Sequence, residues 1–127
     1  PVPLYRTSRV RCNSQETSNM SKLSTEDLAQ HMARHPDWHL TAPWLARDIQ
    51  FKTFAEAWRF MNLIAQHAEA QDHHPNWYNV YGTVQIRLSS HDADGVTERD
   101  FRLASSIDQS LSDFDYTDLP PTPVFKG

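Results

Sequence analysis

Apolar residues recur at three- and four-residue steps along residues 53–71, which predicts the principal helix of this chain. The stripe that they form consists of Phe54, Ala57, Trp58, Met61, Ile64, Ala65 and Ala68. Phe60 and Leu63 lie off the stripe and widen the apolar surface. We therefore expect part of this helix to face either another subunit or a deep groove of the same domain.

A shorter helix is predicted over residues 25–35. Ser24 precedes it as a good N-cap, and Pro36 ends it because proline cannot continue a helix. His31 and His35 share one face of this helix. Because no further metal ligand follows at a suitable spacing, we expect both histidines at the surface.

Thr97 and Asp100 predict the start of the last helix, since they stand at the two positions of a capping box. From there the apolar residues again follow a helical spacing as far as residue 114. The core side of this helix is predicted to be Phe101, Ala104, Ile107, Leu111 and Phe114.

Strict alternation over residues 83–89 predicts the clearest strand. Residues 77–81 precede it as a second strand, and Gly82 provides the turn of a hairpin. A less regular hairpin is predicted from the apolar residues near Trp38 and those of 45–51, with a turn at residues 41–43.

The predicted order of elements is α-β-β-α-β-β-α, which indicates an α+β fold. Along residues 83–89 the apolar side chains alternate with Thr83, Gln85, Arg87 and Ser89, so one face of the sheet is polar. A sheet with one polar face is covered by helices on its other face. We expect a four-stranded antiparallel sheet with three helices packed on one face.

The 127 residues are enough for one domain with a modest core. Residues 1–21 are rich in Arg and Ser, which fits a transit-like leader or a disordered N-terminal extension, and we favour the extension. Residues 22–114 carry the predicted elements and form the expected domain. Residues 115–127 are a Pro-rich tail that we expect to be extended and poorly ordered.

The charge of the chain argues against a general nucleic-acid or anionic-membrane surface, because the net charge is −4. Residues 1–22 are an exception, with four bases and one acid. The single cysteine, Cys12, cannot form an internal disulfide. No apolar run approaches the ~20 residues that cross a bilayer, so we expect a soluble, cytoplasmic protein, with nuclear or organellar targeting left open.

Three histidines fall at the two outer ends of the second hairpin. His73 and His74 precede its first strand and His91 follows its second strand, so the hairpin brings them together. Asp72 and Asp92 are their direct neighbours in the sequence, and Asp100 lies at the start of the helix that follows. Imidazoles give and take protons near neutral pH, and carboxylates can orient them. This cluster indicates general acid–base catalysis.

Other interpretations of these residues remain open. Asp100 can serve only as a helix cap, and an adjacent histidine pair is often only a polar turn. His73, His74, His91 and Asp92 could surround a metal ion, although adjacent histidines rarely chelate one ion and no Cys pair or His-Glu-x-x-His helix is present. A glycine-rich phosphate loop is excluded, because the chain has only three glycines.

The chain resembles the pterin-4a-carbinolamine dehydratase family over roughly residues 22–114. The resemblance rests on Glu69, the run His73-His74-Pro75, Tyr81, His91 and Asp100, together with Trp77-Tyr78-Asn79-Val80-Tyr81 and Thr97-Glu98-Arg99-Asp100. It implies dehydration of a 4a-hydroxytetrahydropterin to quinonoid dihydropterin and water. This step recycles the pterin after aromatic amino acid hydroxylation and uses no metal or cofactor.

The resemblance also implies roles for individual residues. The catalytic residues would be His73, His74 and His91, and we take His74 as the main acid–base group. The pterin pocket would be lined by Asp72, His73, His74, Ser89, Ser90, His91 and Asp92. Glu69, Trp77 and Asp100 would support the site.

Partners follow from the same resemblance. We expect a pterin substrate and a homodimer or homotetramer, with no direct nucleic-acid or membrane partner. Animal members also act as a dimerisation cofactor for a homeodomain transcription factor. The alternative function is therefore a non-enzymatic binding module, which would grip a partner helix through the helix face near Phe60 and Leu63.

Overall fold

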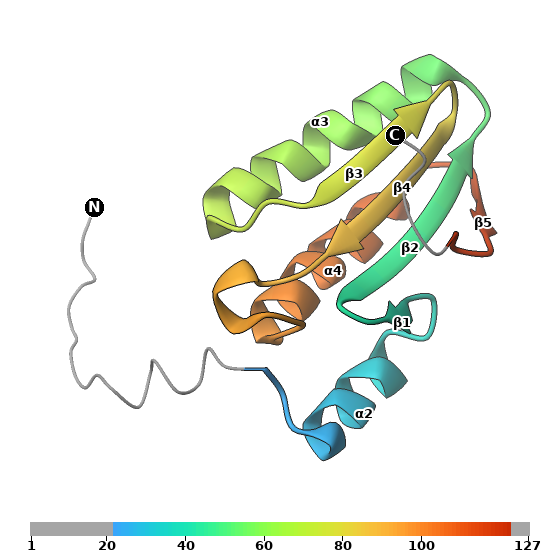
Figure 1. Cartoon of the computed structure of the whole chain (residues 1–127). Coiled ribbons are helices and arrows are strands. Elements are labelled where there is room, and N and C mark those ends of the chain that lie inside the picture. Colours follow the sequence, from blue (N-terminus) through green and yellow to red (C-terminus); the bar gives the residue numbers. More distant parts are fainter. Residues whose placement is uncertain (1–21, 123–127) are drawn as a thin grey trace.

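Residues 22–122 are described by the computed structural model, in which helices cover one face of an antiparallel sheet (Figure 1). In chain order the elements are α2 (Thr25–Arg34), β1 (His39–Thr41), β2 (Trp44–Phe51), α3 (Phe54–Gln71), β3 (Asn76–Val80), β4 (Thr83–Leu88), the 3-10 helix η1 (His91–Ala93), α4 (Glu98–Leu111) and β5 (Tyr116–Leu119). The α+β class and the order of its helices and first four strands are confirmed. The predicted extension, residues 1–21, and residues 123–127 of the tail lie outside the described residues.

The sheet has the strand order β1-β2-β4-β3, and neighbouring strands are antiparallel. The central pair, β2 and β4, runs from Leu45↔Leu88 to Gln50↔Thr83. β1 and β5 both pair with the other edge of β2, β1 near its start and β5 near its end. Asn76↔Arg87 is the outermost pair of the β3–β4 hairpin, so the segments before β3 and after β4 leave the sheet side by side.

The strand β5 corrects the prediction for the tail. We expected a four-stranded sheet and a poorly ordered segment after residue 114, but Tyr116–Leu119 is a fifth strand. Its backbone pairs with an edge of β2 that would otherwise be open, and its Asp118 accepts a hydrogen bond from Nε of Arg47 at 2.8 Å. These contacts bind the tail to the sheet.

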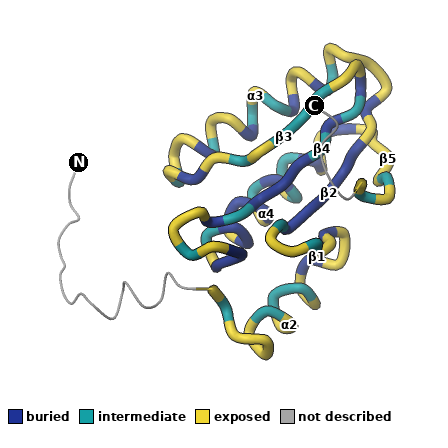
Figure 2. Tube along the Cα trace, in the orientation of Figure 1, coloured by how far each residue is buried: buried dark blue, intermediate teal, exposed yellow. Residues whose placement is uncertain are grey.

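The core lies between the sheet and helices α3 and α4, and burial is greatest along β2 and β4 (Figure 2). The buried residues of α3 are Ala57, Phe60, Ile64 and Ala68. Phe60 is fully buried, and its ring centroid lies 5.0 Å from that of Phe51. By contrast, Phe54 and Trp58 are 48% and 53% exposed.

The predicted stripe of α3 is therefore wrong at several positions. Phe60 cannot contact another subunit, and Leu63 is partly buried against the core. The physical reason is that α3 carries apolar residues around most of its circumference, so that periodicity alone leaves its rotation open. Packing against the sheet chooses the face with Phe60 and leaves Phe54 and Trp58 outside.

The predicted helix caps are present. Ser24 accepts a hydrogen bond from the Asp27 N–H at 3.1 Å, and Thr97 and Asp100 form the capping box of α4. The expected surface position of His35 is wrong, because this side chain is buried. Its Nε2 lies 3.0 Å from Oγ of Ser105 in α4, a residue 70 positions away that periodicity within α2 cannot reveal.

Two arginines of the central strands are almost fully buried. Arg87, expected on the polar face of the sheet, donates to Asp48 at 2.5 Å and to the backbone carbonyl of Thr122 at 2.7 Å. Arg47, on the opposite face, donates to Asp108 at 2.6 Å. Burial by itself would lower the pKa of Arg47, but the hydrogen bond and charge of Asp118 and the charge of Asp108 outweigh it, so that this pKa is raised.

Candidate active site

The end of α3 determines where the histidine pair lies. Asp72 ends the helix in the left-handed conformation, with φ 52° and ψ 44°. The backbone N–H of His73 then donates to the carbonyl of Ala68 at 3.0 Å, a common way for a helix to stop. His73, His74 and Pro75 follow as a short link into β3.

The segment after β4 forms the facing wall. Ser90 and Gly95 exchange two backbone hydrogen bonds, at 2.8 and 3.3 Å, which close a tight loop around η1. His91 is the first residue of η1 and is exposed. Since β3 and β4 are antiparallel neighbours, this loop lies beside the histidine pair.

The two segments enclose an open cavity of about 430 Å³. Its lining residues are Asp72, His73, His74, Pro75, Asn76, Ser89, Ser90, His91, Asp92 and Arg99. All the residues that the sequence placed in a pterin pocket are among them, including the three predicted catalytic histidines. Their catalytic and substrate-binding roles remain predictions.

Asp100 is a fully buried carboxylate that holds His73. Its Oδ1 accepts a hydrogen bond from Nε2 of His73 at 2.5 Å. Its Oδ2 accepts from the Ser90 hydroxyl at 3.0 Å and from the Thr97 N–H at 2.8 Å. Asp100 is therefore both a helix cap and a partner of His73, so the two interpretations of this residue are compatible.

These contacts decide the protonation of the neutral His73 ring. An ionised carboxylate can only accept, so Nε2 of His73 carries the proton. Nδ1 is then a free acceptor, and it has no hydrogen-bond partner among residues 22–122. A buried ring held in one orientation, with one acceptor nitrogen left over, is suited to receive a proton.

His74 is held more loosely. Its Nε2 lies 2.7 Å from a carboxylate oxygen of Glu69 in the last turn of α3. Both side chains are exposed, with His74 at 55%, so water screens this pair. Glu69 thus orients His74 without lining the cavity itself.

Arg99, which the sequence did not predict as a site residue, also lines the cavity. It is the second residue of α4 and donates to Oδ1 of Asp92 at 2.6 Å. The hydrogen bond from Arg99 lowers the pKa of the Asp92 carboxyl below its usual value. A signal was present in the sequence, because Arg99 stands within the run Thr97-Glu98-Arg99-Asp100 that carried the family resemblance.

Three neighbouring residues at the start of β3 differ from the predicted site. Trp77 pairs with Ile86 in the hairpin, on the core side of β3, and packs against the hydrophobic core rather than lining the cavity. Asn76 and Pro75 do line it, although the sequence did not single them out as binding residues. Within residues 22–122, no group of three or more His, Cys, Asp or Glu side chains is arranged to hold a metal ion.

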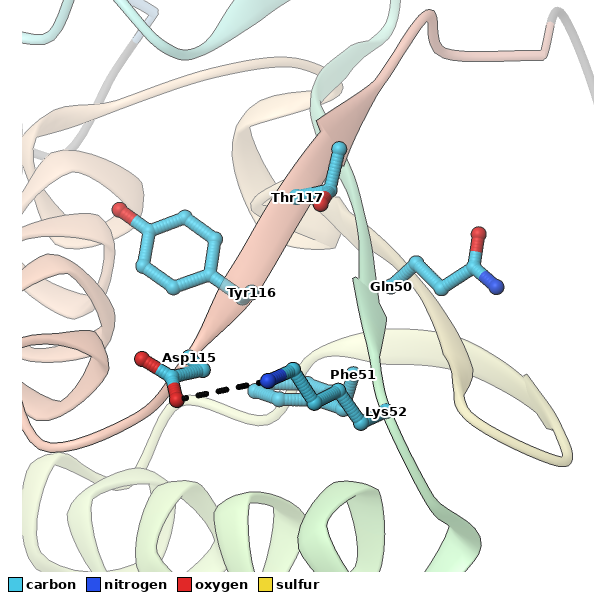
Figure 3. A pocket seen from close by; sticks show the side chains of 6 residues that line it. All are labelled: Gln50, Phe51, Lys52, Asp115, Tyr116 and Thr117. Atoms are coloured by element: carbon cyan, nitrogen blue, oxygen red, sulfur yellow. Dashed lines mark ion pairs between the residues drawn. The ribbon is translucent and has the colours of Figure 1, made fainter.

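A second open cavity, of about 570 Å³, lies where β2 ends and β5 begins (Figure 3). It is lined by Gln50, Phe51, Lys52, Asp115, Tyr116 and Thr117. Lys52 and Asp115 form an exposed ion pair there at 3.9 Å. The cavity contains no imidazole, so it lacks the proton-transfer groups found beside His73.

Along the described residues, no helix is long and apolar enough to cross a membrane.

Comparisons with known proteins agree with this geometry. The model of the family described as "Pterin 4 alpha carbinolamine dehydratase" matches residues 21–110. Two curated relatives, from Christiangramia forsetii and Rhodospirillum rubrum, are each 46% identical to the chain. The aligned regions cover 70% and 69% of this chain and 92% and 94% of the relatives, and both relatives carry the name "Putative pterin-4-alpha-carbinolamine dehydratase".

A solved structure has the same fold. It is described as a transcriptional coactivator/pterin dehydratase from Brucella melitensis and is 30% identical, with a TM-score of 0.68. The similarity covers 71% of this chain and 98% of that one. With its histidine-lined cavity between α3, the hairpin and α4, the chain belongs to the pterin-4a-carbinolamine dehydratase family.

Proposed function

We propose that this protein dehydrates a pterin-4a-carbinolamine to quinonoid dihydropterin by histidine acid–base catalysis, as a step of tetrahydropterin recycling. The observation that carries the proposal is the cavity in which three histidines meet, one of them held by the buried Asp100. The family membership of the chain and the names of its relatives support the same reaction.

The reaction requires two proton transfers. The C4a–O bond breaks as an acid protonates the hydroxyl, which leaves as water. The electrons of the N5–H bond form the new C4a–N5 double bond, and a base accepts the N5 proton. No oxidant or reductant is needed, and imidazoles can serve at both ends.

The side chains can be assigned to these transfers. His74 is the main acid–base group, because it faces the cavity with a carboxylate partner that orients it. Nδ1 of His73 is a fixed acceptor on the same wall. His91 comes from the facing loop, where it can assist at the other face of a bound ring.

A dehydratase assay with the purified protein and His74→Ala tests the proposal. Because His74 supplies proton transfer, its loss should lower kcat by about 10²-fold or more. The matched control is His39→Ala, an exposed histidine on β1 outside the cavity. Near-wild-type turnover of His74→Ala would remove this assignment. If the wild-type protein does not accelerate the reaction, the proposed enzymatic function is wrong.

A second function, as a binding module, has its own support. Phe54 and Trp58 are both about half exposed, and their rings stack with centroids 6.3 Å apart on the outer side of α3. The Brucella melitensis structure is described as both coactivator and dehydratase. This face, and not the one with Phe60, is the candidate surface for a homodimer, a homotetramer or a partner helix. Light scattering after size exclusion tests whether the chain forms a homo-oligomer. A monomer would contradict that expectation.

A further inference from the structure

The proton transfers proposed above use histidines and give no role to Arg99, a charged residue that also lines the cavity. Its side chain is only 21% exposed although it is charged. Its Nε is buried and has no hydrogen-bond partner among residues 22–122. One terminal nitrogen donates to Asp92 at 2.6 Å. The guanidinium is thus partly desolvated and has one strong polar contact.

The position of Arg99 in α4 is electrostatically unfavourable. It follows Glu98 in the first turn, where the partial positive charge of the helix N-terminus favours acids over bases. The carboxylate of Asp92 compensates this cost, because it lies beside the same helix end. The contact therefore ties the loop with Asp92 to the start of α4.

That loop carries His91. Asp92 is the next residue in η1, a single turn held by backbone hydrogen bonds from Ala93 to Ser90 at 3.0 Å and from Asp94 to His91 at 3.2 Å. The His91 ring itself forms no hydrogen bond with any described residue. Its position therefore depends on how the turn is anchored.

Two side-chain contacts join the turn to consecutive residues of α4, in addition to the contacts of Ser90 with Thr97 and Gly95. Ser90 is buried and donates to Asp100, while Asp92 accepts from Arg99. Asp100 holds His73 as well. Two consecutive residues of one helix thus contact the two segments that carry catalytic histidines.

We propose that Arg99 is a positioning residue of the active site, which holds His91 at the cavity through Asp92 as Asp100 holds His73. The proposal rests on the dehydratase function inferred above. The hydrogen bond from Arg99 lowers the pKa of Asp92, in agreement with a contact between two charged groups.

The test uses Arg99→Gln, Asp92→Asn and the double variant in the full chain. Each single change should lower kcat by about 10-fold or more with little change in KM, because a displaced catalytic group slows the chemistry. The double variant should be no slower than the slower single variant, since both changes break one contact. Arg99→Lys should retain more activity than Arg99→Gln, because an ammonium keeps the charge opposite Asp92.

A structural measurement accompanies the kinetics. Amide hydrogen exchange at Ala93 and Asp94 should accelerate in both single variants, while exchange at Ile86 in the central strand β4 stays slow and shows that the protein is folded. Arg102→Gln is the matched control, an exposed arginine one turn along α4, and it should change neither measurement.

Three results would overturn the proposal. If Asp92→Asn keeps wild-type kcat while Arg99→Gln raises only KM, Arg99 contacts the substrate directly. If the two losses add in the double variant, the residues act separately. Unchanged exchange at Ala93 and Asp94 in Arg99→Gln would also reject the positioning role. Should the wild-type protein lack dehydratase activity, the proposed function fails, and the exchange measurement still decides whether Arg99 anchors the turn.

Discussion

Helix α4 carries two buried or partly buried carboxylates, and their surroundings differ in one decisive respect. Asp100, in its first turn, pairs with His73 beside an open cavity. Asp108, two turns later, accepts from Arg47 at 2.6 Å and from the indole N–H of Trp38 at 2.8 Å. Both carboxylates join distant elements, but only Asp100 has a hydrogen-bond partner that can exchange a proton near neutral pH.

This comparison separates a structural charge from a candidate catalytic one. The guanidinium of Arg47 stays protonated and is surrounded by the side chains of Asp37, Asp108 and Asp118. His73 keeps an acceptor nitrogen without a partner in the described part of the chain. Burial of a charge therefore does not identify a site by itself. A candidate catalytic site is indicated when the partner of the buried charge can titrate, lies at a cavity and has a nitrogen free to accept a hydrogen bond.

The largest effect is expected when the structural cluster is broken. Arg47→Met leaves Asp108 and Asp118 without their cation. Because both carboxylates are partly exposed, we expect a loss of about 3 kcal/mol, at the lower end of the range for buried ion pairs. Denaturant unfolding should show this loss, whereas kcat of the folded protein should stay close to that of the wild type. Arg102→Met is the control for loss of an exposed arginine. A large loss of kcat at unchanged stability would contradict the separation of the two clusters.

For Asp100→Asn we expect the main effect on kcat. Since the Thr97 N–H and the Ser90 hydroxyl require an acceptor, the amide oxygen must replace Oδ2, and the NH₂ group then faces His73. His73 would have to move its proton to Nδ1, and kcat should fall by about 10²-fold.

Nitrogen NMR of His73 checks this tautomer change directly. The exposed Asp113→Asn, just after α4, serves as the control and should leave both the spectrum and kcat unchanged. If Nδ1 of His73 stays unprotonated in Asp100→Asn while kcat falls, the tautomer explanation is wrong.

The smallest effect concerns the exposed carboxylate Asp92, whose pKa the hydrogen bond from Arg99 lowers from its usual value of 3.8. A lowered folded-state pKa means that the unfolded chain binds the proton more readily, so the contribution of Asp92 is present above pH 3.8 and is lost as the pH falls through the folded value. The free energy of unfolding, measured with urea, should therefore differ more between wild type and Asp92→Asn at pH 7 than at pH 3. An equal difference at both pH values would contradict a lowered pKa of Asp92 in the folded protein.

The local parts of the fold could be predicted well. The cap at Ser24, the capping box of Thr97 and Asp100, and the hairpin of β3 and β4 depend on residues a few positions apart. Because that hairpin brings its outer ends together, the positions of His73, His74 and His91 around one cavity also followed from the sequence. The family resemblance added the expected chemistry of the pocket.

The tertiary structure alone decided the rest. It turned Phe60 inward and Trp58 outward on a helix that is apolar on most sides, and it paired Arg47 with Asp108 and Asp118, which lie 61 and 71 residues away. It also added β5 and brought Arg99 to the cavity. Periodicity and capping record interactions within a few residues of the chain. Burial and ion pairing depend on which distant surfaces meet, and that is settled only when the sheet and helices pack.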